Sequence, residues 1–322
     1  SGVIFMKTVF LDLDTVSNRD IELEAITATG VDLVVHGVTS DEQIDERLAD
    51  AEIVITNKKH LDRARLTRAG KLKLVCLVAT GTNNVDLEAA ADLGIGVCNI
   101  VAYCTVSVVQ HVFAMFLALT RRLDDYPALL REGSWRDSPQ FCMLDYPIRE
   151  LDGRTLGIVG HGELGSAVAR VADAFGMRVM IAQRPGGEPA TDRTPLDELL
   201  GQADIVSLHC PLTDATRNLI ADRELALMKS DAMLINTARG ALVDSAALAR
   251  ALLEGRIGGA GIDVLAEEPP ISGDALIDED LPNLIVTPHI AWAATEARQR
   301  ALDEVAGNIR SFLDGDRRGR VV

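Results

Sequence analysis

Three polar side chains follow successive predicted strands in the second half of the chain: Arg239, Glu268 and His289. An arginine guanidinium can bind a carboxylate through two parallel hydrogen bonds and polarise a carbonyl. A histidine can give or take a proton near neutral pH, and a neighbouring glutamate can orient its ring. Together these residue types suit the chemistry of a small carbonyl acid, provided that the strands carrying them end at one edge of a sheet.

A glycine-rich turn is the second chemical signal. Residues 155–160 form an apolar run that predicts a buried strand, and Gly160, Gly162 and Gly165 follow with the spacing G-x-G-x-x-G. Such glycines permit a tight turn, close approach of the backbone to a pyrophosphate, and close packing of a helix on a strand. The N–H groups at the start of the helix then face the phosphates. The motif predicts a dinucleotide-binding domain that begins in mid-chain, with another domain wrapped around it.

Short apolar runs alternate with amphipathic stretches along most of the chain, which is typical of βαβ units and parallel sheets. The first part is predicted to contain strands at 7–13, 31–36, 52–56, 73–78 and 95–98, with helices at 41–50 and 86–93. A long apolar helix over 105–123 is expected to bridge two domains. The second part is predicted to contain strands at 155–160, 177–182, 204–208, 232–236, 258–263 and 284–286, with helices at 163–175 and 293–313.

The composition narrows the class of protein. At 322 residues, two domains are expected. The net charge of −16 argues against a nucleic acid or an anionic membrane as partner, and no apolar run reaches transmembrane length. The five cysteines are dispersed, with no C-x-x-C pair, which favours reduced thiols in the cytoplasm over disulfides or a metal site.

The motifs together resemble those of the D-2-hydroxyacid dehydrogenases. The likeness rests on the glycine turn at 160–165, on Asn-Thr-Ala-Arg-Gly at 236–240, and on Glu268-Pro269 and Pro288-His289. The substrate loop of that family is matched by residues 81–86, and the likeness extends from Lys7 to Phe312. Within the family, residues 182–185 and 288–292 look most like bacterial glycerate dehydrogenases, that is, hydroxypyruvate or glyoxylate reductases.

This resemblance implies an α/β fold of two Rossmann-like domains, with the active site in the cleft between them. A flavodoxin-like substrate domain would comprise residues 1–101 plus 291–322, and an NAD(P)-binding Rossmann domain residues 102–290. The implied reaction is the reversible, NAD(P)H-dependent reduction of hydroxypyruvate or glyoxylate to D-glycerate or glycolate. Rival interpretations are reduction of another 2-oxo acid, such as phosphoglycerate chemistry or a larger acid, or a non-catalytic corepressor that senses dinucleotides.

The family also implies roles for individual residues. Arg239 binds the substrate carboxylate and carbonyl, His289 is the general acid in reduction, and Glu268 orients it. Backbone N–H groups at Thr80 and Gly81 bind the other side of the substrate carboxylate, and Asp263 contacts the nicotinamide carboxamide. The expected cofactor contacts are Thr105, Gly160, His161, Gly162, Glu163, Leu164, Gly165, Gln183, Arg184, Pro185, His209, Cys210, Pro211, Thr216, Thr237, Ala238, Arg239, Asp263, His289 and Ala291.

The choice between NADH and NADPH depends on the end of the second strand of the cofactor domain. NAD-binding Rossmann folds place an acid there for the ribose 2′-hydroxyl, but this chain has Gln183-Arg184-Pro185. Arg184 could pair with a 2′-phosphate, so NADPH is favoured. The alternative is that Arg184 stacks on adenine and NADH is used.

Several residues have two interpretations. Glu267 could replace Glu268 as the partner of His289, and His209 could either border the cofactor or only pack. Trp292 could belong to the core or to the pocket wall. His36 and His111 are expected to be structural.

Residues 134–148 interrupt the alternation of strands and helices and carry several apolar side chains. One interpretation is a surface excursion that packs on its own domain. The other is an arm of a homodimer formed through the cofactor domain, with Trp135 or Phe141 near the pocket of the partner subunit.

Overall fold

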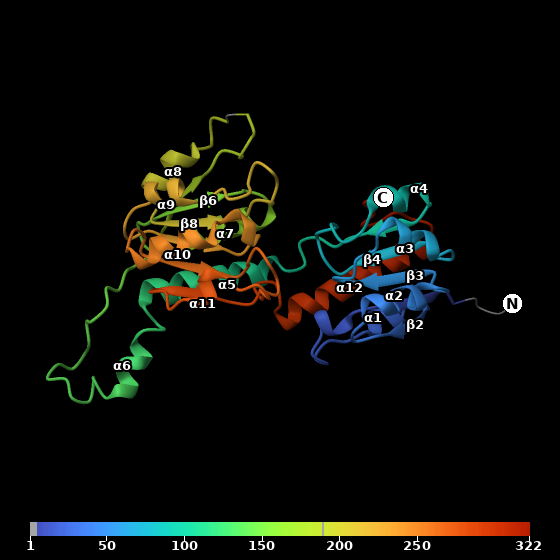
Figure 1. Cartoon of the computed structure of the whole chain (residues 1–322), viewed down its shortest axis with the longest axis horizontal. Coiled ribbons are helices and arrows are strands. Elements are labelled where there is room, and N and C mark those ends of the chain that lie inside the picture. Colours follow the sequence, from blue (N-terminus) through green and yellow to red (C-terminus); the bar gives the residue numbers. More distant parts are fainter. Residues whose placement is uncertain (1–4, 189) are drawn as a thin grey trace. The chain divides into compact units, whose positions relative to one another are not determined.

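The structure is a computed structural model that describes residues 5–188 and 190–322. The chain forms two compact units: the smaller runs up to Cys104 and includes Trp292–Val322, and the larger is Thr105–Ala291. Each unit is built on a parallel sheet with helices (Figure 1). The prediction of two parallel α/β domains is therefore confirmed.

The smaller unit has a five-stranded sheet with the order β2-β1-β3-β4-β5, which is the flavodoxin-like order. β3 and β4 are buried along their whole length, as expected for central strands covered on both faces. The last helix of the chain, α12, packs on this sheet through residues such as Leu302 and Val305. The elements are β1 (Lys7–Phe10), η1 (Leu13–Thr15), α1 (Glu24–Thr27), β2 (Asp32–Val35), α2 (Asp41–Leu48), β3 (Ile53–Thr56), α3 (Arg63–Arg68), β4 (Leu74–Leu77), α4 (Leu87–Asp92), β5 (Gly96–Cys98) and α12 (Thr295–Leu313).

The larger unit has a six-stranded sheet with the order β11-β10-β9-β8-β6-β7. After β7 the chain crosses to the far side of β6 to form β8, so the strand order reverses beside β6, where α/β sheets bind ligands. The elements are α5 (Thr105–Arg121), α6 (Tyr126–Glu132), β6 (Thr155–Val159), α7 (Glu163–Ala174), β7 (Arg178–Ile181), α8 (Leu196–Gln202), β8 (Ile205–Leu208), α9 (Asp222–Leu227), β9 (Met233–Asn236), η2 (Gly240–Leu242), α10 (Ser245–Leu253), β10 (Gly259–Ile262), α11 (Ala275–Asp278) and β11 (Leu284–Val286).

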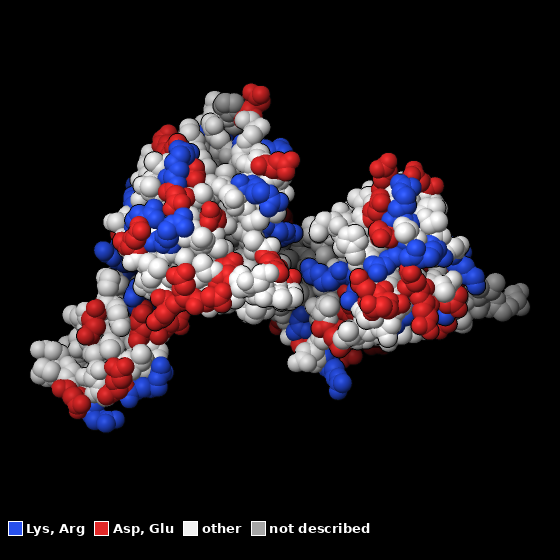
Figure 2. Space-filling view, in the orientation of Figure 1, with Lys and Arg blue, Asp and Glu red and all other residues white. Residues whose placement is uncertain are grey.

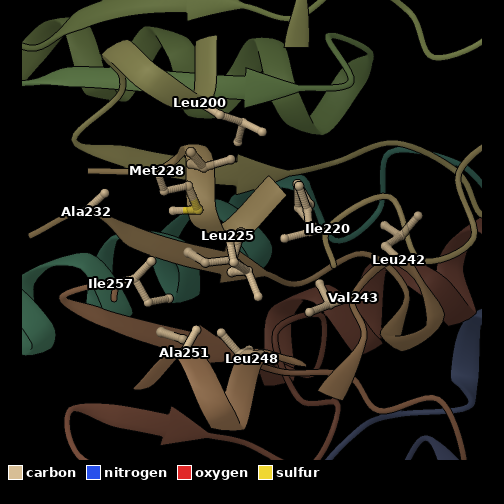
Figure 3. Close-up of a cluster of buried hydrophobic side chains, with 14 of the residues drawn as sticks. Leu200, Ile220, Leu225, Met228, Ala232, Leu242, Val243, Leu248, Ala251 and Ile257 are labelled. Carbon is tan, nitrogen blue, oxygen red and sulfur yellow. The ribbon is translucent and has the colours of Figure 1, made fainter. Parts of the chain in front are cut away.

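A hydrophobic core holds the strands of the larger unit in place. Leu200, Leu225, Met228 and Leu248, from α8, the end of α9 and α10, meet in this cluster (Figure 3). Burial of each such side chain stabilises the fold by roughly 1.5–3 kcal/mol relative to exposure. The polar loops that follow β8, β9 and β10 are therefore anchored to a well-packed sheet. On the outside of the same unit, acidic side chains gather around α11 (Figure 2).

Each of the eleven predicted strands is present in the part of the chain that the structure describes. The first strand is shorter than predicted, because it ends at Phe10 and a 3₁₀ turn follows at Leu13–Thr15. The carboxylate of Asp12 accepts the backbone N–H groups of Asn57 and Lys58, which takes this residue out of the ladder.

A projecting segment follows α5 in the larger unit. α6 and the loop after it extend away from the sheet of this unit (Figure 1). The segment is held locally: the indole N–H of Trp135 donates to the carbonyl of Phe141 at 3.0 Å, and the rings of Tyr126 and Tyr146 meet edge to face. Trp135, Phe141 and Leu144 are nevertheless largely exposed.

Within the described residues, no single helix is long and apolar enough to cross a membrane. α5 and α6 reach that length and composition only as a pair, bent by 52°.

Candidate active site

Three adjacent parallel strands carry the predicted catalytic residues. Arg239 follows β9, Glu268 lies in the loop after β10, and His289 follows β11. These strands are neighbours in the order β11-β10-β9. Their carboxyl ends therefore meet at one edge of the sheet, as the sequence predicted.

His289 and Glu268 form a hydrogen-bonded pair. Nδ1 of His289 lies 2.6 Å from Oε2 of Glu268, and the two side chains are only 34% and 36% exposed. The adjacent Glu267 instead binds Ser272, accepting its backbone N–H at 3.1 Å. Of the two glutamates left open by the sequence, Glu268 is the partner of the histidine.

The loop that carries Arg239 lies close to the loop that carries Glu268, and the Arg239 guanidinium donates to the carbonyl of Ala238 at 2.7 Å. A Cβ on Gly240 would lie 1.9 Å from the carbonyl carbon of Leu265, so only glycine allows the contact. The backbone N–H of Leu265 donates in turn to Oε1 of Glu268 at 2.9 Å. Asn236 fixes the arginine loop, donating to the carbonyl of Arg239 and accepting the N–H of Ala238. Sequence reasoning did not assign this role to Asn236.

The turn that carries His289 is anchored by Asp263. This buried carboxylate accepts the hydroxyl of Thr287 at 2.6 Å and the backbone N–H groups of Ile290 and Ala291 at 2.8 and 2.9 Å. Its backbone carbonyl accepts the N–H of His289 at 2.7 Å. These contacts hold His289 at a φ of 56°, which is uncommon for a residue other than glycine.

His111, expected to be only structural, reaches this turn as well. Its Nε2 lies 3.0 Å from the hydroxyl oxygen of Thr287 and 3.6 Å from Oδ1 of Asp263. The two partners are 176 positions apart in the sequence, so no local pattern could have revealed the contact.

The glycine turn has the shape that a pyrophosphate requires. Gly160 has a φ of 96°, and a Cβ there would lie 2.5 Å from the backbone nitrogen of Cys210. A Cβ on Gly165 would lie 2.0 Å from the carbonyl oxygen of Gly160, so α7 packs directly on the turn. Gly162, the N-cap of α7, has open space where its Cβ would be. That space, beside the N–H groups at the helix start, fits a phosphate.

The other predicted residues of this turn line its rim. His161 and Leu164 are partly exposed, and Glu163 is exposed. The side chain of Glu163 accepts the hydroxyl of Thr105 at 3.1 Å, which ties the start of α5 to the start of α7.

The segment after β7 places Arg184 at the start of a Pro-Gly turn. The N–H of Gly187 donates to the carbonyl of Arg184 at 2.9 Å, and Gly186 has a φ of 69°. Gln183 and Pro185 flank Arg184 and are partly exposed, while Arg184 is exposed and forms no ion pair with any described residue. No carboxylate occupies the strand end, so the feature on which the NADPH expectation depends is present.

Two buried polar atoms near the ends of β8 and β9 have no hydrogen-bond partner among the described residues: Nδ1 of His209 and Oγ1 of Thr237. The other ring nitrogen of His209 lies 2.8 Å from the hydroxyl oxygen of Ser207, and burial lowers the pKa of His209 to about 4. Buried polar atoms are normally paired, so these two atoms are suited to the polar groups of a bound ligand. They fit a nucleotide cofactor.

Other contacts of the loop after β8 are hydrogen bonds within the loop itself. The hydroxyl of Thr216 donates to the carbonyl of Pro211 at 2.8 Å and accepts the N–H of Thr213 at 2.7 Å, which closes the loop. Burial raises the pKa of the Cys210 thiol, because the thiolate would be poorly solvated.

Thr80 and Gly81 lie in the smaller unit, in the loop after β4. The hydroxyl of Thr80 donates to the carbonyl of Ile100, and its carbonyl accepts the side-chain amide of Asn99, both at 2.8 Å. In the described structure, the backbone N–H groups of Thr80 and Gly81 have no intramolecular acceptor. Trp292, in the same unit, packs edge to face on Tyr103 and against the core, which supports the core interpretation of this residue.

The described side chains contain no group of three or more His, Cys, Asp or Glu residues arranged to hold a metal ion.

The comparisons with known proteins agree on one protein family. Residues 113–291 match the family model described as D-isomer specific 2-hydroxyacid dehydrogenase, NAD binding domain. The chain is 47% identical to the glycerate dehydrogenase of Methylorubrum extorquens over 85% of this chain and 86% of the relative. It is 36% identical to the hydroxypyruvate reductase of Blautia hydrogenotrophica over 96% and 98% of the two chains.

The same likeness holds for a solved structure. The D-lactate dehydrogenase of Aquifex aeolicus, complexed with NAD and lactic acid, superposes with a TM-score of 0.81 at 30% identity, covering 96% of each chain.

Proposed function

The chain belongs to the D-isomer specific 2-hydroxyacid dehydrogenase family, and on that premise we propose that it reduces hydroxypyruvate and glyoxylate to D-glycerate and glycolate. It is a nicotinamide-dependent D-2-hydroxyacid dehydrogenase. The observation that carries the proposal is the hydrogen-bonded pair of Glu268 and His289, at the edge of the sheet where the neighbouring strand β9 leads into Arg239.

A nicotinamide dinucleotide fits the larger unit. Gly162 and the N–H groups that begin α7 would hold the pyrophosphate. His209 and Thr237 offer buried polar atoms to the rest of the cofactor. When bound in its reduced form, the nicotinamide supplies the hydride that goes to C2 of the 2-oxo acid. The other predicted cofactor residues, including Thr105, Thr216, Asp263 and Ala291, remain part of this proposal.

The protein side chains have separate tasks in the reduction. The planar guanidinium of Arg239 binds the substrate carboxylate and polarises the carbonyl at C2. Nδ1 of His289 is engaged with Glu268, so Nε2 is the nitrogen that donates a proton to the carbonyl oxygen. The carboxylate of Glu268 stabilises the protonated ring before that transfer.

The substrate domain is proposed to contribute through Thr80 and Gly81. Their backbone N–H groups point to no acceptor within the described chain, and unpaired backbone donors suit a carboxylate. We assign substrate binding to residues 1–101 plus 291–322 and dinucleotide binding to residues 102–290.

Hydroxypyruvate and glyoxylate are the proposed substrates because relatives named hydroxypyruvate reductase and glyoxylate reductase match most of this chain. The test is a panel of 2-oxo acids assayed with NADH and NADPH, with the configuration of the product determined by chiral chromatography. The highest kcat/KM for hydroxypyruvate or glyoxylate, with D-glycerate formed from hydroxypyruvate, is the expected result. A clear preference for a larger acid, or formation of L-glycerate, would reject the proposal.

NADPH is the proposed preferred form of the cofactor. Arg184 is exposed at the end of β7 with no carboxylate beside it at the strand end, so a 2′-phosphate would be attracted rather than repelled.

We further propose a homodimer formed through the projecting segment of the larger unit. Trp135, Phe141 and Leu144 are 52%, 90% and 82% exposed there, and contiguous exposed apolar groups mark interaction sites. Sedimentation of the wild type and of a Trp135→Ala variant tests this, together with the KM for the 2-oxo acid. Dimerisation and KM both unchanged by the substitution would reject a role for Trp135. The five free cysteines are consistent with a proposed cytoplasmic location.

A further inference from the structure

The turn at 287–291 needs support that its own sequence does not supply. His289 adopts a left-handed backbone conformation, which is strained in a residue other than glycine and persists only when its surroundings hold it. The carboxylate of Asp263 accepts three hydrogen bonds from the turn. The question is what fixes Asp263 and Thr287 themselves.

The direction of the hydrogen bonds identifies His111 as a donor. A threonine hydroxyl has one proton, and that of Thr287 is directed to Oδ1 of Asp263 at 2.6 Å. At its other contact Thr287 must therefore accept, so Nε2 of His111, 3.0 Å away, carries a proton. His111 is also the one basic side chain within 4.0 Å of the Asp263 carboxylate among the described residues.

Helix α5 holds the other end of the turn as well. The hydroxyl of Ser107 donates to the carbonyl of Ala291 at 2.6 Å. Ser107 and His111 are four positions apart and so share one face of the helix. The two side chains contact the turn on either side of His289, at Thr287 and at Ala291.

The same face of α5 continues onto the strand that carries Asp263. Met115, four positions beyond His111, packs against Gly261 of β10: a Cβ on this glycine would lie 2.9 Å from Sδ of Met115. The missing side chain lets the helix approach the strand closely. Ser107, His111 and Met115 thus set the distance between α5, β10 and the histidine turn.

We propose that His111 and Ser107 are positioning residues for His289, acting through Thr287, Asp263 and Ala291. The inference rests on the proposed role of His289 as proton donor. His111 orders the Thr287–Asp263 hydrogen bonds, and Asp263 in turn sets the backbone of the turn, so that the imidazole faces both Glu268 and the substrate. A loosened turn would misplace the proton donor more than it weakens dinucleotide binding, because the glycine turn proposed to hold the pyrophosphate is a separate segment at the start of α7.

The test compares His111→Phe, which keeps a ring but loses the donor, with His111→Gln, which retains an N–H at a similar reach. For His111→Phe we expect kcat to fall about tenfold or more with KM for the 2-oxo acid and the Kd for the dinucleotide changed less than about threefold, since a misplacement of 1 Å can cost 100-fold. His111→Gln should recover most of the lost kcat. Gln110→Ala, an exposed neighbour on the same helix, is the matched control.

A second measurement does not depend on turnover. The Nδ1 proton of His289, hydrogen-bonded to Glu268 at 2.6 Å, should give a downfield proton resonance in the wild type, assigned by its loss in His289→Gln. The resonance should broaden or move in His111→Phe and Thr287→Val, and persist in His111→Gln and Gln110→Ala. Denaturant unfolding of each variant identifies any that fails to fold.

The experiments test the proposed function and the positioning role of His111 separately. Wild-type protein that reduces no 2-oxo acid rejects the proposed function, while the proton resonance still tests the positioning of His289. His111→Phe with wild-type kcat and an unmoved resonance would overturn the positioning role. So would a His111→Gln variant as impaired as His111→Phe, because the ring packing rather than the donor would then matter.

Discussion

One carboxylate, that of Glu268, is held at both of its oxygens: Oε2 lies 2.6 Å from Nδ1 of His289, and Oε1 accepts the backbone N–H of Leu265 at 2.9 Å. The glutamate therefore cannot rotate without losing one of the two bonds. This fixes the plane of the imidazole, of which Nε2 is the proposed proton donor to the substrate. The backbone of Leu265 also lies close to the glycine that follows Arg239, so the same short segment contacts both the arginine loop and Glu268.

The charge of Glu268 is predicted to matter more than its hydrogen bond. In Glu268→Gln the side-chain amide can still accept a hydrogen bond from Nδ1 of His289. It no longer stabilises a charged ring, so kcat should fall about 10- to 100-fold. Glu267→Gln is the matched control, because Glu267 binds Ser272 instead of the histidine, and its kcat should stay within about threefold of wild type. Steady-state kinetics with hydroxypyruvate measures both. Equal losses in the two variants would contradict the assignment.

The planar fork of Arg239 is predicted to be needed as well as its charge. Arg239→Lys should raise KM for the 2-oxo acid about tenfold and lower kcat/KM about 100-fold, since an ammonium cannot bind a carboxylate through two parallel bonds. Arg250→Lys serves as control, because that arginine only pairs with Asp222 on the surface. Dinucleotide affinity, measured by fluorescence titration, should be little changed. A wild-type KM in Arg239→Lys would exclude this role.

Arg184 is predicted to distinguish the two dinucleotides. Arg184→Ala should raise KM for NADPH about tenfold and leave that for NADH nearly unchanged, because only NADPH carries a 2′-phosphate. Arg193→Ala, in the same connection between β7 and α8, is the control. The NADPH proposal fails if the wild type has the higher kcat/KM with NADH, or if Arg184→Ala affects both cofactors equally.

His209 is predicted to make the fold sensitive to acid. Burial lowers the pKa of His209 to about 4 in the native protein, against 6.5 for an exposed histidine. Between these two values the unfolded chain binds the extra proton, so the free energy of unfolding should decrease as pH falls from 6.5 towards 4, by at most about 1.4 kcal/mol per pH unit. Above pH 6.5 the ring is neutral in both the native and the unfolded state, so this loss of stability is absent there.

Urea unfolding at pH 7, 6 and 5 isolates the effect when wild type is compared with His209→Gln. The difference in stability should shift in favour of the variant as the pH is lowered. A difference that does not change with pH would show that the native ring already accepts a proton in this range.

The sequence was sufficient to predict the strands of the two sheets and to place the three proposed catalytic residues after neighbouring strands. Runs such as residues 232–236 and 258–263 are apolar enough to be strands whatever surrounds them, and parallel pairing then brings the polar residues after them to one edge. The glycines at 160, 162 and 165 could also be interpreted from the sequence, because their spacing alone identifies a local turn.

The supporting contacts could not be predicted, because each joins segments that are distant in the sequence. The roles of His111 and Asn236 depend on partners at Thr287 and Arg239 whose positions only the folded sheet defines. The need for glycine at position 240 depends likewise on the backbone of Leu265. Short helices such as α3 were missed because a single buried residue, Leu66, gives no periodic pattern.

The most direct test of the account is the rate of hydride transfer in a His289→Gln variant. Single-turnover decay of NAD(P)H absorbance with hydroxypyruvate, at saturating concentrations of both, measures that step without product release. The account predicts a fall of about 100-fold or more with the Kd for the dinucleotide essentially unchanged, because the variant lacks a group that can donate a proton to the carbonyl oxygen. A rate within about threefold of wild type would contradict the assignment of His289 as the proton donor.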